Sequence, residues 1–224
     1  MSRRIGLIVP SSNTVAEVDF YRRLPDAATL HTARMYLEDV TAEAETTMLD
    51  EHLPRAVADI ATTQPDVVVF ACTSAGALRG NAAEDALIAS IARQTGAPTV
   101  SVAAAVRSAI DSRRARRIGV ITPYVPSLND KIRASLEEDG LEVAAIHGLG
   151  IVDNHEIGAV EPERIIGFAC DCFEPSAVDL LFVSCTNFRA VEARPRIEEL
   201  LYVPVVTSNQ AALEAVLGRT ASAA

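Results

Sequence analysis

Residues 3–10, RRIGLIVP, recur 113 residues later as residues 116–123, RRIGVITP, and six of the eight positions are identical. The same shift carries residues 66–73, DVVVFACT, onto residues 179–186, DLLFVSCT. One register therefore explains two separate matches, which indicates an internal duplication. We predict two similar lobes at residues 1–105 and 106–215, followed by a tail at residues 216–224.

The segments between these motifs alternate between short runs rich in valine and isoleucine and longer stretches of helical period. Such alternation is typical of parallel sheets covered by helices. We predict an α/β fold of two pseudo-symmetric, doubly wound lobes with the active site in the cleft between them. Strands are expected at 4–10, 29–35, 66–71, 98–102, 117–122, 141–147, 178–184 and 203–207. Helices are expected at 14–24, 41–63, 76–94, 103–113, 127–139, 161–173, 188–200 and 209–217. The last strand and helix could cross back to complete the first lobe.

The composition limits the classes of partner. The chain has 224 residues with 30 acidic against 20 basic side chains, a net charge of −10, which disfavours non-specific binding to nucleic acids or acidic membranes. No run of 18 apolar residues and no signal-peptide cleavage site is seen, so we expect a cytoplasmic protein with reduced thiols. A small anionic substrate is still compatible, because local N–H groups, amides and hydroxyls bind carboxylates.

Cys72 and Cys185 occupy the same register of the repeat, each directly after a predicted strand. In parallel α/β sheets, ligands bind at the carboxyl ends of the strands. Residues of capping type follow both cysteines: Thr73 and Ser74 in the first lobe, Thr186 and Asn187 in the second. This pattern predicts thiols near helix N-termini, where N–H groups favour the thiolate, facing each other across the cleft. A single cysteine at a strand end is more often a packing residue, but two in one register favour catalysis.

The other cysteines and the histidines do not form a recognisable metal motif. Cys170 and Cys172 are two apart in a predicted helix, so their side chains point to different faces, and we interpret them as packing residues. The four histidines lack ligand spacing, and no metal site is expected. No glycine-rich nucleotide loop opens a helix, so neither NAD nor ATP is expected as a cofactor.

Further polar residues follow three predicted strands and could bind carboxylates. Ser12 and Asn13 follow the first strand, Tyr124 follows its repeat, and Asn154 follows the sixth. Hydroxyls, amides and free helix N–H groups are suitable donors to a carboxylate. Taken singly, Ser12, Asn13 and Asn154 could equally cap helices or make turns. The candidate substrate-binding residues are Ser12, Asn13, Thr73, Ser74, Tyr124, Asn154, Thr186 and Asn187.

The combination of these motifs resembles the maleate cis–trans isomerases, over nearly the whole chain. That family belongs to the aspartate/glutamate racemase superfamily, which includes arylmalonate decarboxylases, hydantoin racemases and amino-acid racemases. The resemblance implies a homodimeric, cofactor-independent enzyme that converts maleate or a related small cis-dicarboxylate to fumarate. It further implies that Asn13, Tyr124 and Asn154 hold the substrate carboxylates. By the same resemblance, the Cys72 thiolate adds to the alkene carbon and Cys185 gives or takes a proton.

Other reactions remain open at this point. Residues 73–80, TSAGALRG, are closer to the corresponding loop of the arylmalonate decarboxylases, although those enzymes lack a thiol at the position of Cys72. A racemase or epimerase would use both thiols as acid and base on either face of a stereocentre, with Asp153 or Glu17 available for an ammonium group. A small-anion binding protein without activity is a third alternative.

Overall fold

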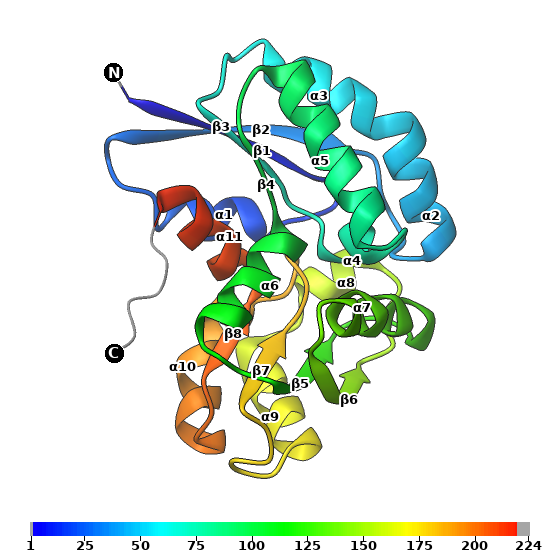
Figure 1. Cartoon of the computed structure of the whole chain (residues 1–224), viewed down its shortest axis with the longest axis vertical. Helices are drawn as coiled ribbons and strands as arrows, with labels where there is room; N and C mark the ends of the chain where they lie inside the picture. Colours follow the sequence, from blue (N-terminus) through cyan, green and yellow to red (C-terminus); the bar gives the residue numbers. More distant parts are fainter. Residues whose placement is uncertain (1, 219–224) are drawn as a thin grey trace.

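The computed structural model describes residues 2–218 and contains two four-stranded parallel sheets, one above the other in Figure 1. The strand orders are β2-β1-β3-β4 and β6-β5-β7-β8, so the two sheets repeat one topology. The strands are β1 (Arg3–Pro10), β2 (Ala28–Met35), β3 (Val67–Phe70), β4 (Thr99–Ser101), β5 (Arg117–Thr122), β6 (Glu142–Gly148), β7 (Leu180–Val183) and β8 (Val205–Thr207). The predicted α/β fold with two doubly wound sheets is confirmed.

Helices cover both sheets, and Figure 1 places α3 and α5 on one side of the first sheet and α1 and α11 on the other. The helices are α1 (Ala16–Tyr21), α2 (Ala42–Thr47), the π-helical turn η1 (Met48–His52), α3 (Leu53–Ala61), α4 (Thr73–Ala77), α5 (Asn81–Thr95), α6 (Val102–Ser112), α7 (Pro126–Glu138), α8 (Asn154–Gly158), α9 (Pro162–Cys172), α10 (Ala190–Leu201) and α11 (Ser208–Leu217). None of the helices within residues 2–218 is long and apolar enough to cross a membrane.

The sequence repeat corresponds to equivalent strand pairing in the two sheets. Ile5 of β1 is paired with Val67 of β3, and Ile118 of β5 is paired with Leu180 of β7. Each pair is preceded by an aspartate whose carboxylate accepts backbone N–H groups at the start of the neighbouring strand, as Asp179 does from Arg116 and Arg117. Because the registers match, the cysteines that follow β3 and β7 emerge at equivalent edges of the two sheets.

Two glycines of the repeat allow helices to pack closely on the central strands. A Cβ atom at Gly6 would lie 2.9 Å from Ile60 of α3, and one at Gly119 would lie 2.5 Å from the ring of Phe173, which follows α9. Both distances are shorter than van der Waals contact. Glycine at this position of the repeat therefore leaves room for Ile60 in the first lobe and for Phe173 in the second.

Two helical predictions were wrong in detail. The segment expected as one helix at 76–94 is divided into α4 and α5, because Gly80 adopts a φ of 85°, which ends the helical path. The short helix α8 was not predicted. It begins where the Asp153 carboxylate accepts the N–H groups of His155 and Glu156, which satisfies two of the free donors of its first turn.

The end of the described chain connects the two halves of the molecule. Strand β8 pairs with β7 in the second sheet, whereas α11 contacts β3 and β4 of the first sheet as well as α1 and α6. The lobe boundaries at residues 105 and 215 remain a prediction, and residues 219–224 of the expected tail lie outside the described residues.

Replacing Gly119 tests the close packing of helix on strand. We expect Gly119→Ala to lower the free energy of unfolding by about 1–3 kcal/mol, because the Phe173 ring must move to admit a methyl group. Gly167→Ala on α9 is the matched control, since no atom lies within 4 Å of the position of its Cβ apart from its chain neighbours and the backbone of its own helix. Urea unfolding followed by circular dichroism measures both, and equal loss of stability in the two variants would contradict the packing argument.

Candidate active site

Both repeat cysteines line one cavity between the two sheets. About 230 Å³ of space, part of it open to solvent, lies at this site. Its walls are formed by Pro10, Asn13, Leu37, Val40, Glu45, Cys72, Ser74, Tyr124, Asn154, Cys185, Thr186 and Asn187. Cys72, Cys185 and Tyr124 are each 5% exposed or less, so these three side chains are shielded from solvent. The prediction that the mirrored strand ends meet at a shared cavity is therefore confirmed in geometry.

Cys72 lies between the fully buried strand β3 and the short helix α4. It is the N-cap residue of α4, with an extended backbone at φ −141° and ψ 110°, and its carbonyl accepts the N–H of Gly76 at 3.2 Å. The Sγ atom lies 3.9 Å from the hydroxyl oxygen of Ser74. The predicted position of this thiol beside a helix N-terminus is confirmed.

Cys185 is held in a different local structure. Its φ of 109° lies in the left-handed region, which a residue with a side chain adopts at a cost of about 1–3 kcal/mol. Its N–H donates to Ser208 Oγ at 3.0 Å, and its Sγ accepts the N–H of Asn187 at 3.2 Å. The next helix begins only at Ala190, so the prediction of a helix N-terminus at this thiol was wrong. The turn after β7 supplies N–H groups in place of a helix.

Burial dominates the ionisation of both thiols. Removal from water raises the pKa of Cys185 to about 12, although hydrogen bonds from the Tyr124 hydroxyl and the Asn187 N–H oppose the rise. Burial raises the pKa of Cys72 in the same direction, and the nearby Glu45 carboxyl adds to the effect. Desolvation therefore opposes the predicted preference for thiolates in this site and outweighs the local N–H groups.

Asn13 connects the two lobes through its side chain. Its Oδ1 accepts the N–H groups of Val15 and Ala16 ahead of α1, and its Nδ2 donates to Thr186 Oγ1 at 3.0 Å. The alternatives of helix capping and cavity lining therefore both apply to this residue. The Thr186 hydroxyl in turn donates to the carbonyl of Ala71, next to Cys72.

Asn154 and Asn187 form a second connection between the lobes. The Nδ2 group of Asn187 donates to Asn154 Oδ1 at 3.0 Å, while its Oδ1 accepts the N–H of Thr14 at 2.8 Å. Asn154 Nδ2 donates to Ser12 Oγ at 2.8 Å. These amides are fixed by one another, so their positions in the cavity wall are well defined before any ligand binds.

Two predicted substrate-binding residues, Ser12 and Thr73, do not line this cavity. The Ser12 hydroxyl donates to the carbonyl of Leu37 and accepts from Asn154, so it supports the wall from behind. The Thr73 hydroxyl donates to Ser208 Oγ at 2.9 Å. The remaining predicted residues, Asn13, Ser74, Tyr124, Asn154, Thr186 and Asn187, lie in the wall.

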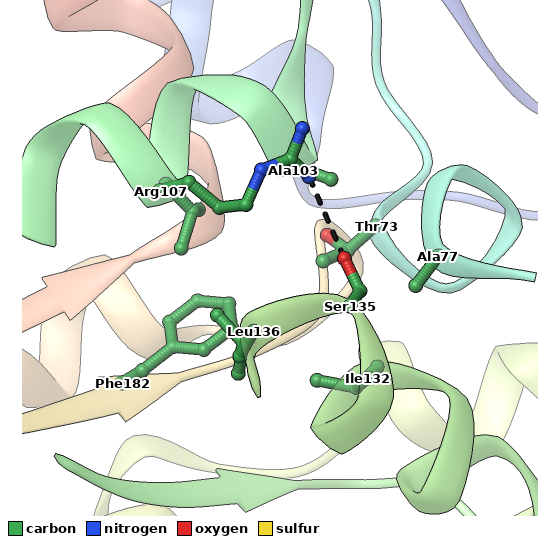
Figure 2. A pocket seen from close by; sticks show the side chains of 9 residues that line it. Thr73, Ala77, Ala103, Arg107, Ile132, Ser135, Leu136 and Phe182 are labelled. Carbon is green, nitrogen blue, oxygen red and sulfur yellow. Dashed lines mark hydrogen bonds between the residues drawn. The ribbon is translucent and has the colours of Figure 1, made fainter. Parts of the chain in front are cut away.

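Thr73 instead lines a second cavity between α4, α6, α7 and β7, which is shown in Figure 2. Its space of about 250 Å³ is partly open to solvent. Most of its wall is apolar. Arg107 reaches it from α6 and pairs with Glu84 at 3.0 Å and Asp139 at 2.6 Å. The charge of Arg107 is thus already compensated within the protein. We therefore interpret this cavity as a gap in the packing between the lobes.

The sequence did not predict the part of the wall that follows β2. Leu37 and Val40 come from the connection between β2 and α2, and Glu45 comes from α2 itself. This connection is fixed to the second lobe, since Val40 N–H donates to the carbonyl of Val152 at 2.8 Å and Asn154 N–H donates to that of Glu38 at 3.2 Å. It therefore closes the cavity on the side of α8.

The sequence around Glu45 contains a pattern that predicts burial of this side chain. Glu45 precedes Met48 and Leu49 by three and four residues, so it lies on the apolar face of its helical segment. A carboxyl group on such a face is buried, and Glu45 is 0% exposed. The acids suggested for an ammonium group lie elsewhere: Glu17 pairs with Arg34, and Asp153 caps α8.

The structure also corrects the interpretation of the remaining cysteines. Cys170 is exposed on α9 rather than packed, whereas Cys172 is partly buried against the core. In residues 2–218 no group of three or more His, Cys, Asp or Glu side chains is arranged to hold a metal ion.

Comparisons with known proteins agree with this geometry. The family model for arylmalonate decarboxylase matches residues 5–223. The chain is 31% identical to a maleate isomerase of Nocardia farcinica over 82% of its length and 76% of that protein, and 29% identical to one of Geobacillus stearothermophilus over 96% and 90%. A solved structure of the Nocardia farcinica maleate cis–trans isomerase, a cysteine mutant with a covalently bound succinylcysteine intermediate, is 28% identical, with a TM-score of 0.90 over 98% of this chain and 93% of that one.

Thiol alkylation tests the burial of the cavity. At pH 7.5 iodoacetamide is expected to label the exposed Cys170 at least about 100-fold faster than Cys72 or Cys185, because both buried thiols are shielded and protonated. Peptide mass spectrometry over time gives the three rates. The variant Cys170→Ser, which lacks the exposed cysteine, is the control and should lose the fast labelling. Labelling of Cys72 as fast as Cys170 would show that the cavity is open in solution.

Proposed function

The chain belongs to the family of arylmalonate decarboxylases and maleate isomerases, and from this premise we propose that it is a maleate cis–trans isomerase acting through a covalent cysteine adduct. The observation that carries the proposal is the pair of thiols, Cys72 and Cys185, in one buried cavity whose other polar groups are amides, hydroxyls and the carboxyl group of Glu45. A pure decarboxylase does not need a thiol at both strand ends. The relatives named maleate isomerase support the same assignment.

In the proposed reaction the sulfur of Cys72 adds to one alkene carbon of maleate. The π electron pair moves to the other alkene carbon, which receives a proton from Cys185, and the proton lost by Cys72 replaces it on Cys185. Overall, one S–H bond adds across the double bond and leaves a succinyl thioether. Rotation about the new single bond follows. Cys185 then gives its own proton to the departing Cys72 sulfur and takes up a proton from the substrate carbon, which restores both thiols and releases fumarate.

The amides and hydroxyls of the wall perform the binding. Asn13 and Asn154 present side-chain amides, and Tyr124 presents a hydroxyl whose pKa is raised by burial, so it stays a donor. We propose that these three groups hold the substrate carboxylates, with support from Ser74, Thr186 and Asn187. Donors that are fixed before binding stabilise the charge that develops on the carboxylate next to the carbanion.

We also propose that the enzyme is a cytoplasmic homodimer, that it needs no cofactor, and that residues 1–105 and 106–215 act as two lobes around the site. The resemblance to the maleate isomerases supports the dimer. Sedimentation analysis at micromolar concentration is expected to give twice the mass of one chain, and a single species of monomer mass would contradict this part of the proposal.

Turnover without additions tests the function. Purified protein, treated with a chelator and incubated with maleate, is expected to produce fumarate, as measured by proton NMR. Cys72→Ala and Cys185→Ala should each lower the rate by about 10³-fold or more, because each removes a group that reacts with the substrate. Cys170→Ala, a change at an exposed cysteine of the same chain, should leave the rate unchanged. Full activity of Cys72→Ala would refute the adduct mechanism.

A further inference from the structure

Glu45 is the one carboxyl group in the described wall of the cavity, and the mechanism above does not use it. It lies on α2 and is completely buried. The Ser74 hydroxyl donates to its Oε1 atom, whereas its Oε2 atom is buried and has no hydrogen-bond partner. A buried polar atom without a partner in a binding cavity indicates a group that a ligand satisfies.

No cation compensates this carboxyl group. Among the described residues no Arg, Lys or His nitrogen lies within 4 Å of it, and the Ser74 hydroxyl is its only polar partner. Burial raises the pKa of Glu45 to about 8, although the bond from Ser74 lowers it. At neutral pH the side chain is therefore mostly a carboxylic acid. With Oε1 engaged as an acceptor, its proton belongs on Oε2, where it is available for donation.

The other titratable groups that face Glu45 do not change this conclusion. Cys72 faces it from the start of α4, while Tyr124 and Cys185 face it from the second lobe. Burial raises the pKa of all three side chains above the pH range in which Glu45 titrates. They remain neutral while Glu45 titrates.

Charged groups on the elements around α2 are directed elsewhere. Asp50 of η1 pairs with Arg79 at 2.7 Å, and His52 packs against the ring of Tyr36. Glu43 of α2 is exposed to solvent. The ionisation of Glu45 is therefore governed by the cavity and by the ligand inside it.

We propose that Glu45 is a substrate-binding residue, which donates its carboxylic acid proton to one carboxylate of the dicarboxylate beside Ser74. This inference rests on the proposed function, since it assigns one end of the proposed substrate. In a buried cavity without a cation, two adjacent carboxylates cannot both be ionised at low cost, so the pair shares one proton. Glu45 thus selects a hydrogen-bond acceptor at this end of the substrate, and the amides of the other wall hold the opposite end.

The sign of the pH dependence follows from this arrangement. Below pH 8 Glu45 is already protonated, and a dicarboxylate binds without taking up a proton. Above pH 8 the free enzyme has lost that proton and must recover it to bind, so affinity falls by about tenfold per pH unit and about one proton enters with each ligand. A ligand with an amide or ammonium donor at this end would show the opposite trend, because it needs the ionised carboxylate.

Calorimetry with succinate, an unreactive dicarboxylate, tests the proposal independently of turnover. Binding is measured from pH 7 to pH 9.5 in pairs of buffers with different ionisation enthalpies, which report proton uptake. Wild type is expected to show the loss of affinity and the proton uptake above pH 8. Glu45→Gln keeps an N–H donor and should bind within a few-fold of wild type at pH 7, with neither effect. Glu45→Leu should bind about tenfold or more weakly at pH 7.

Glu43→Gln on the exposed face of the same helix is the matched control and should behave as wild type. Thermal melting of each variant confirms that it is folded. Succinate binding in wild type without proton uptake, or the same pH dependence in Glu45→Gln, would overturn the role of Glu45 and leave the proposed isomerase intact. Tighter binding of succinamate than of succinate, increasing above pH 8, would also overturn it. Failure of both succinate and maleate to bind wild type would refute the proposed function itself.

Discussion

Burial of two thiols in a cavity whose described wall contains no cation is the constraint on which the rest of the site depends. It keeps Cys72 and Cys185 protonated in the closed molecule, and it excludes compensation of a bound carboxylate by a surface lysine or arginine. Substrate charge must therefore be matched by neutral donors. The asparagines, the tyrosine hydroxyl and the acid of Glu45 are groups of this kind, and each is almost completely buried.

The fold maintains this cavity by joining the lobes with hydrogen bonds around the thiols. Ser208, at the start of α11, accepts from the Thr73 hydroxyl of the first lobe and from the Cys185 N–H of the second. Asn13 reaches Thr186 across the same boundary. These bonds hold Cys185 in its strained backbone conformation, which directs its side chain into the cavity next to Cys72. A strained backbone persists only where the surrounding contacts hold it in place. Such residues are found most often at functional sites.

Sequence reasoning found the duplication and, from it, most of the fold. The repeated motifs at residues 3–10 and 66–73 predicted equivalent strands in two lobes, and their register predicted that Cys72 and Cys185 would face each other. These features are local and periodic, so they can be recognised without coordinates. Asn13 and Asn154 were found for the same reason, because each follows directly after a strand or its turn.

The missed features depend on tertiary contacts. Thr73 follows its cysteine as Thr186 follows the other, yet only Thr186 lines the cavity, because the Thr73 hydroxyl is bound to Ser208. The protonated state of the thiols follows from burial, which a strand-end motif does not specify. Glu45 is distant in sequence from every motif and reaches the cavity through the packing of α2 against α4. Its position on an apolar helical face was the only local sign.

The central claim is that the sulfur of Cys72 bonds to the substrate while Cys185 moves the proton. Intact-mass and peptide mass spectrometry of Cys185→Ser, incubated with maleate and quenched in acid, tests it most directly. The serine hydroxyl of this variant can still give a proton to the carbanion, whereas elimination needs a base that takes a proton back from carbon. The account therefore predicts that the variant accumulates one adduct with the mass of one maleic acid, located on the peptide that contains Cys72. An unmodified Cys72, or an adduct only on the exposed Cys170, would contradict the account.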